Sequence, residues 1–198
     1  METFFISIMF LTSVTSLTFI VYCGFALRAE RVMPSALQST ADACRTPEDR
    51  PVLKRLCEQS HSPLARLLLS AEDHLDLPQE ENEAALQTRA RQEVVYLERG
   101  LVILEIIVGI APLLGLVGTI YGMITLFGGL GDAAATDNSV LARGISFILG
   151  FTMTGLLIAI PSLIAWSYYN KKVEMLAVEM ETICSEFLRR QYRALSKH

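Results

Sequence analysis

Three long runs without a charged residue stand out in the pattern of apolar and polar positions along the chain. They cover residues 3–27, 106–131 and 144–170. A helix needs about 20 predominantly apolar residues to cross the hydrocarbon core of a bilayer, and each run meets that length. The pattern therefore predicts an all-α membrane protein with three transmembrane helices.

The polar stretch between the first two runs carries helix-start signals. Thr46-Pro47 and Ser62-Pro63 each place a capping residue before a proline, which suits the first position of a helix. A further helix is expected to begin at Pro78 and to continue into the second run. The second transmembrane helix should thus extend beyond the bilayer into the cytosol.

After the third run, apolar residues recur at steps of three and four, which gives a helix one apolar seam. The seam consists of Val173, Leu176, Met180, Ile183 and Phe187. It predicts that the third transmembrane helix also extends into the cytosol and packs against the helix that begins at Pro78 or against a neighbouring subunit. An amphipathic helix on the membrane surface is the alternative.

The basic residues set the expected orientation, because Lys and Arg near the ends of transmembrane helices favour the cytosolic side. Of the 17 Lys and Arg residues, all but Arg143 fall within 28–99 or 171–198. Because Arg28 and Arg31 follow the first run, it should stay as an anchor rather than be cleaved as a secretory signal. The predicted order is a first transmembrane helix with a periplasmic N-terminus (1–27), a cytosolic helical segment (28–99), a second transmembrane helix (100–128), a periplasmic loop (129–139), a third transmembrane helix (140–170) and a cytosolic amphipathic helix (171–198).

Composition narrows the function classes. The 198 residues are 52% hydrophobic and 19% charged, which is not the balance of a water-soluble domain. The formal net charge of −4 gives no case for nucleic-acid binding. The four cysteines have no paired spacing and no histidine cluster nearby, so we expect reduced, unlinked thiols, no metal site and no cofactor.

Small residues mark the faces on which the second and third runs should pack. In lipid, small residues let helix backbones approach closely. Ala111 with Gly115, and Gly118 with Gly122, form two successive small-xxx-small pairs in the second run. The residues expected at the helix contact are Gly115, Gly118, Gly122, Gly155, Pro112 and Pro161.

Threonine hydroxyls are the chemistry that these faces offer. Thr119 lies between Gly115 and Gly122, and Thr152 lies three residues before Gly155, which predicts a polar-lined interface. No Asp, Glu, His, Lys or Arg occurs within 106–131 or within 144–170. If the protein moves protons, a partner must therefore supply the titrating carboxylate.

Two further acidic features bear on the function. Glu105, at the cytosolic end of the second run, is the candidate for an entry or exit residue of a proton route. The sequence Gly129-Leu130-Gly131-Asp132 fits the G-x-G-D pattern of intramembrane aspartyl proteases. That chemistry needs a second aspartate within the membrane, and the sequence offers none, so we do not expect an enzyme.

The second and third runs resemble a known family. The segments APLLGLVGTIYGMITLF (111–127) and LARGISFILGFTMTGLLIAIPSLIAWSYYNKKVE (141–174) are similar to the second- and third-span signatures of the MotA/TolQ/ExbB proton-channel family. The three-span layout is similar to the ExbB/TolQ-like branch, since MotA-type stators have four spans. The resemblance covers roughly residues 90–190.

This resemblance implies an inner-membrane homopentamer around two copies of a single-span ExbD/TolR-like partner, whose aspartate carries the proton. It implies that Thr119 and Thr152 line the proton path, and that proton flow energises transport or other work at the outer membrane. Many ExbB-like proteins carry a glutamate five residues before the third-span threonine, where this chain has Phe147. A non-conducting membrane scaffold in an envelope complex is the alternative that Phe147 supports.

Overall fold

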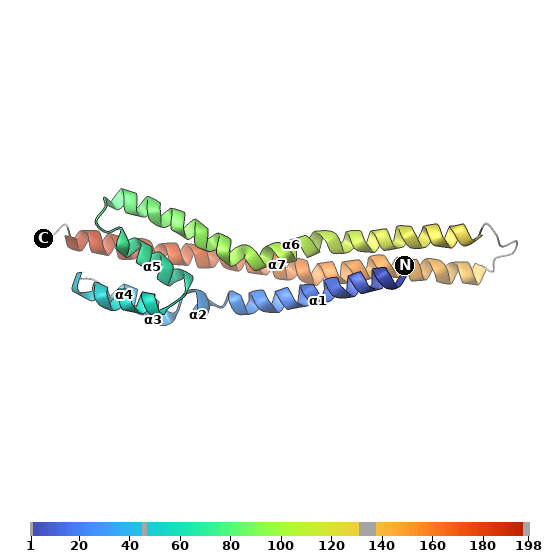
Figure 1. The fold of residues 1–198 in the computed structure, drawn as a ribbon, viewed down its shortest axis with the longest axis horizontal. Coiled ribbons are helices and arrows are strands. Elements are labelled where there is room, and N and C mark those ends of the chain that lie inside the picture. The colour runs from blue at the N-terminus through green and yellow to red at the C-terminus, as the bar shows by residue number, and fades with distance from the viewer. Residues whose placement is uncertain (1, 45–46, 131–137, 196–198) are drawn as a thin grey trace. The chain divides into compact units, whose positions relative to one another are not determined.

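The computed structural model describes residues 2–44, 47–130 and 138–195, and within these ranges it contains helices and no strand. Figure 1 shows their order: α1 (Glu2–Ala26), α2 (Ala29–Val32), α3 (Ser35–Ala43), the 3₁₀ turn η1 (Pro47–Asp49), α4 (Arg50–Gln59), α5 (Pro63–Asp73), α6 (Gln79–Leu130) and α7 (Asn138–Leu195). The prediction of an all-α chain is confirmed.

Three helices are long and apolar enough to cross a membrane, which confirms the prediction of three spans. They cover Thr3–Ala26, Gln79–Gly128 and Leu141–Leu195. The second includes the helix that was expected to begin at Pro78, and α6 passes through Gly100 without a break. Of the residues expected in the loop 129–139, Gly129 and Leu130 belong to α6, and Asn138 and Ser139 belong to α7. Thr46 and Gly131-Asp132 of the G-x-G-D sequence lie outside the described residues.

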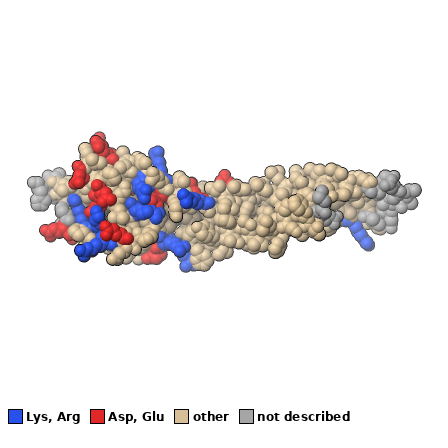
Figure 2. Space-filling model, in the orientation of Figure 1, with Lys and Arg blue, Asp and Glu red and all other residues tan. Residues whose placement is uncertain are grey.

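The chain divides into two compact units. The apolar unit consists of Met1–Cys23 and Gly100–Tyr168, and the polar unit consists of Gly24–Arg99 and Tyr169–His198. On the face shown in Figure 2, acidic and basic side chains gather over the helices of the polar unit, whereas the apolar unit shows very few. This division matches the apolar runs of the sequence.

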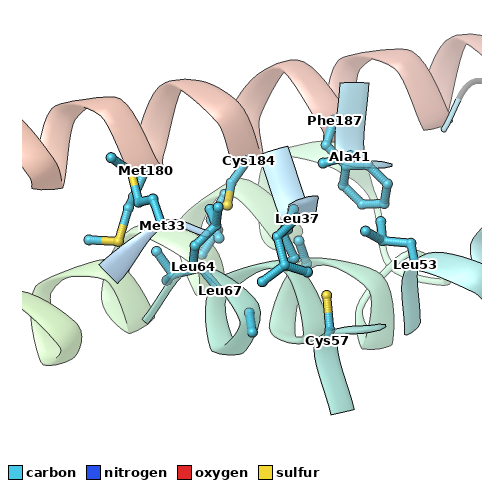
Figure 3. Packing of buried hydrophobic residues seen from close by; sticks show 14 of the residues in the cluster. Met33, Leu37, Ala41, Leu53, Cys57, Leu64, Leu67, Met180, Cys184 and Phe187 are labelled. Atoms are coloured by element: carbon cyan, nitrogen blue, oxygen red, sulfur yellow. The ribbon is translucent and has the colours of Figure 1, made fainter. Parts of the chain in front are cut away.

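The core of the polar unit forms where α5 meets α7. Ser62 caps α5, since its hydroxyl accepts a hydrogen bond from the backbone N–H of Ala65 at 3.3 Å. The buried side chains that fill this core from α5 and α7 include Leu64, Leu67, Leu68, Met180, Cys184 and Phe187, most of which Figure 3 labels. Leu86 and Ala90 of α6 join the same cluster. The seam predicted for α7 is therefore covered by protein, and the alternative of a helix lying on the membrane surface is wrong.

A nearly buried carboxylate ties α5 to α6 in the polar unit. Glu93 is 5% exposed and accepts hydrogen bonds from the Arg66 guanidinium, with Arg66 Nε at 2.9 Å from Oε1 and 3.0 Å from Oε2. Arg89 Nη2 lies 3.4 Å from Glu93 Oε1. The hydrogen bonds to Glu93 raise the pKa of Arg66. Two cations thus compensate for the burial of one anion, which is how a charge is tolerated in an interior.

The four cysteines are free thiols and are buried. Burial is the main reason that the pKa of Cys57 rises to about 11, with smaller contributions from the charges of Glu72 and Glu58. Burial also raises the pKa of Cys44 and that of Cys184. Because the thiolate is the reactive form, these thiols of the polar unit react slowly at neutral pH.

Candidate functional site

Two glycines bring the backbones of α6 and α7 into contact within the apolar unit. A Cβ atom added to Gly155 would lie 2.6 Å from the carbonyl oxygen of Ala111. One added to Gly115 would lie 2.7 Å from the carbonyl oxygen of Phe151 and 3.0 Å from Cα of Thr152. Only glycine fits at these two positions, because backbone atoms cannot move away as a side chain can.

The other two predicted glycines of α6 face side chains of α7 instead of its backbone. A Cβ on Gly118 would meet the Phe151 ring at 3.0 Å, and one on Gly122 would meet Ile148 Cγ1 at 2.7 Å. Both neighbours are side-chain atoms rather than backbone. The structure thus brings four of the predicted glycines onto one α6–α7 contact. Pro112 is half-buried, whereas Pro161 is exposed beside a groove between α1 and α7.

The side chains of the two predicted threonines, Thr119 and Thr152, meet beside the backbone contact at Gly115. Their hydroxyl oxygens lie 3.5 Å apart, with Thr152 directed at Thr119. Thr119 in turn donates to the carbonyl oxygen of Leu116 at 2.7 Å. A direct O–H···O bond spans about 2.5–3.0 Å, so the bond between the two threonines is a loose one. Both side chains are half-buried, and an acceptor placed beside them could replace the weak bond with a stronger one.

Glu105 and Phe147 lie away from this pair of hydroxyls. Glu105 is exposed on α6 and precedes Thr119 by 14 residues, which is about 21 Å along the helix and on nearly the same face. Phe147 is 54% exposed, and its ring packs edge-on against Phe151 with 5.5 Å between ring centroids. Phe147 precedes Thr152 by five residues, which is a rotation of about 140° around the helix axis. A side chain at position 147 therefore lies on a different face of α7 from the Thr152 hydroxyl.

A polar contact that the sequence analysis missed joins α1 to α7. Ser16 is 4% exposed and Ser162 is fully buried, and their hydroxyl oxygens lie 2.6 Å apart. Ser162 donates to the carbonyl oxygen of Ile158 at 2.7 Å, so Ser16 is the donor to Ser162. Met9, Ser16 and Cys23 are all buried and follow one another at intervals of seven, which is the signal that could have identified this face.

The apolar unit therefore contains two spans in backbone contact, a pair of hydroxyls at that contact, and no acidic side chain near it among the described residues. The sequence agrees, because neither 106–131 nor 144–170 contains Asp, Glu, His, Lys or Arg. Such a site can orient water or bind a carboxylate, but a hydroxyl cannot hold a charge at physiological pH.

Comparison with known proteins places these features in a family. The model of the MotA/TolQ/ExbB proton channel family matches residues 53–182, a range that contains both threonines and the glycine contacts. The biopolymer transport protein ExbB of Salmonella typhimurium is 29% identical over 140 residues, which are 66% of this chain and 57% of that protein.

Two further relatives show the same similarity. ExbB of Helicobacter pylori is 36% identical over 81 residues, covering 41% of this chain and 56% of the relative. The Tol-Pal system protein TolQ of Pseudomonas aeruginosa is 32% identical over 103 residues, covering 52% of this chain and 45% of the relative. The chain thus spans about half the length of these curated relatives. From the matched segment, with its apolar helices and its ExbB and TolQ relatives, we conclude that this chain is a multi-pass membrane protein that belongs to the MotA/TolQ/ExbB proton channel family, in its ExbB/TolQ-like branch.

Proposed function

We propose that this chain is a channel subunit that uses the proton motive force to energise transport or other work at the outer membrane. The observation that carries the proposal is the hydroxyl pair of Thr119 and Thr152, with 3.5 Å between their oxygens, at a glycine contact between two spans. The pair offers hydrogen bonds within the membrane but no titrating group. A proton that does work there needs a carboxylate from elsewhere.

The missing carboxylate defines the partner. A single-span protein of the ExbD/TolR type, with an aspartate in its membrane helix, would place that group against the two threonines. A homopentamer of this chain around two partner helices fits the proposal, since each subunit then offers one hydroxyl pair to the enclosed helices. Glu105, on nearly the same face of α6 as Thr119, would serve the cytosolic end of the route. This function requires no catalysis, metal or cofactor in the chain itself.

The proposed location is the bacterial inner membrane, with a periplasmic N-terminus and a cytosolic C-terminus. All Lys and Arg residues except Arg143 fall in 28–99 and 171–198, and Lys and Arg favour the cytosolic side. In this orientation α6 and α7 continue from the bilayer into the cytosol, and the polar unit lies there. Arg143 and the loop around 129–139 then face the periplasm.

Cysteine labelling tests the orientation. A cysteine introduced at Asn138 should react in intact cells, after outer-membrane permeabilisation, with a thiol reagent that cannot cross the inner membrane. A cysteine at Ser196 should react only after the inner membrane is opened. The wild-type chain serves as the control and should give a low background, because its cysteines are buried. Labelling of Ser196→Cys in intact cells would reverse the orientation.

Proton flux into liposomes tests the function itself. The chain alone should give no flux above that of empty vesicles, read with a pH-sensitive dye trapped inside under an imposed potential of known size. Addition of the partner should produce flux, and changing the partner aspartate to asparagine should remove it. Flux from the chain alone would contradict the shared pathway.

The non-conducting scaffold is the second candidate, and the exposed Phe147 is the observation that favours it. A phenyl ring cannot relay a proton, so a path that needs a carboxylate at this position is closed. In the same liposomes, a scaffold would assemble with the partner and still give no flux. Assembly and flux are therefore measured on one preparation.

A further inference from the structure

A groove runs between α1 and α7 within the apolar unit. Its volume is about 670 Å³, and apolar side chains of both helices line most of it. Phe10 and Leu17 on the α1 side, and Met153 and Leu157 on the α7 side, are each at least 60% exposed. The groove is therefore an apolar surface that no described part of the chain covers.

Gly150 keeps the groove open. A Cβ atom added there would meet nothing within 4 Å, whereas one added to Gly115 or Gly155 would collide with the backbone of the facing helix. Packing of α7 against α6 thus does not explain a glycine at 150. The residue lines the groove, where any larger side chain would occupy the space.

Two of the hydroxyls along the groove, those of Thr154 and Ser16, are compatible with an apolar occupant. Thr154 donates to the carbonyl oxygen of Gly150 at 2.8 Å, and Ser16 is paired with Ser162. These groups already have partners within the chain, so they do not call for a polar ligand at the middle of the groove.

The length and the apolar lining of the groove suit an extended hydrocarbon chain. The groove follows α7 from Ser146 to Pro161, a rise of about 22 Å. A space that is long but of about 670 Å³ suits an unbranched acyl chain.

One end of the groove carries a positive charge. Arg143 precedes Ser146 and Phe147, which both line the groove, by three and four residues on α7. Residues at these spacings lie on one face of a helix. Arg143 is exposed and forms no ion pair with any residue in the described ranges. An anionic group is the natural complement to a guanidinium at the edge of a bilayer.

We propose that the α1–α7 groove binds one anionic phospholipid, with an acyl chain beside Gly150 and the phosphate at Arg143. The site is separate from the hydroxyl pair of Thr119 and Thr152 and does not depend on the proposed channel function. Its two parts are independent, because Gly150 provides space for the chain and Arg143 provides selectivity for charge.

Lipid titration of the purified full-length protein, followed by native mass spectrometry, tests this site. The probes are phosphatidylglycerol, which is anionic, and phosphatidylcholine, which has no net charge. The wild-type protein should bind phosphatidylglycerol about tenfold or more tightly than phosphatidylcholine, as expected for charge-assisted hydrogen bonds. Arg143→Gln should remove that preference, because it should lower the binding of phosphatidylglycerol more than that of phosphatidylcholine, whose phosphate is already offset by its own choline cation.

Gly150→Val and Gly150→Phe should lower the binding of both lipids progressively, with the unfolding temperature unchanged. Gly109→Phe is the matched control, because Gly109 also has nothing within 4 Å of an added Cβ but lies on α6 outside the groove. Equal lipid binding by Gly150→Phe and Gly109→Phe would overturn the proposal. So would loss of the oligomer in Gly150→Phe with lipid binding retained, since the groove would then be an interface between copies.

Discussion

Thr119→Val and Thr152→Val are each expected to abolish proton-driven activity while the complex remains assembled. Valine keeps the shape of threonine and removes the hydroxyl that could bond a partner carboxylate. A hydrogen bond to a charged group contributes about 1.5–3 kcal/mol, which corresponds to a loss of roughly 10- to 100-fold for each hydroxyl. Liposome flux with the partner present measures the effect, and native mass spectrometry of the same sample measures assembly.

Thr125→Val is the matched control for these two variants. Thr125 also lies on α6, and its hydroxyl likewise donates to its own helix, to the carbonyl oxygen of Tyr121 at 2.7 Å and to that of Gly122 at 3.1 Å. It differs from Thr119 in that it is not the hydroxyl to which Thr152 is directed. It should retain full flux. If Thr119→Val and Thr152→Val also retain full flux, the hydroxyl pair has no part in conduction.

Gly155→Ala is expected to cause the largest loss of stability among single methyl additions to the glycines of α6 and α7. Its Cβ would lie 2.6 Å from the carbonyl oxygen of Ala111, so the two helices must separate. Overpacking of this kind costs about 1–3 kcal/mol or more. Thermal unfolding, followed by the fluorescence of the single tryptophan, Trp166, measures the loss.

Variants at two other glycines provide comparisons in the same unfolding experiment. Gly109→Ala should leave the unfolding temperature unchanged, because nothing lies within 4 Å of the added atom. Gly118→Ala should fall between the two, since it meets the movable ring of Phe151. In Gly118→Leu the larger side chain should push that ring away and separate the spans, with loss of the oligomer. A stable Gly155→Ala protein would mean that α6 and α7 do not meet at their backbones.

The sequence was sufficient to predict the spans, since length and absence of charge decide whether a helix can cross a bilayer. It was also sufficient for the start of α5, because capping by Ser62 is a local interaction. It was not sufficient for α2 and α3, whose N-cap residues Arg28 and Pro34 make no capping hydrogen bond with a side chain. These two short helices contribute buried residues such as Val32 and Leu37 to the core, so tertiary packing accounts for them.

At the candidate site, the sequence predicted which residues are small but not what each one meets. Gly115 and Gly118 have the same local pattern, yet one faces backbone and the other faces the Phe151 ring. The periodicity of small residues predicts which face of a helix is packed, but it does not predict which atoms pack against that face. Gly100 shows the same limit: an added Cβ would lie 2.9 Å from Sγ of Cys23, a contact between α6 and α1 that no local pattern encodes.

The bond between Ser16 and Ser162 has a consequence for the order in which the protein is built. During synthesis α1 enters the bilayer long before α7 exists, so the Ser16 hydroxyl must first find a partner in its own helix. Thr12, Thr15 and Thr18 do this permanently, each donating to the carbonyl oxygen four residues earlier. An interhelical hydrogen bond in a membrane is worth only about 0.6 kcal/mol on average. The bond to Ser162 therefore adds little to the stability of the α1–α7 contact. It does align the first span with the last along their length, and this alignment can form only once α7 has been inserted.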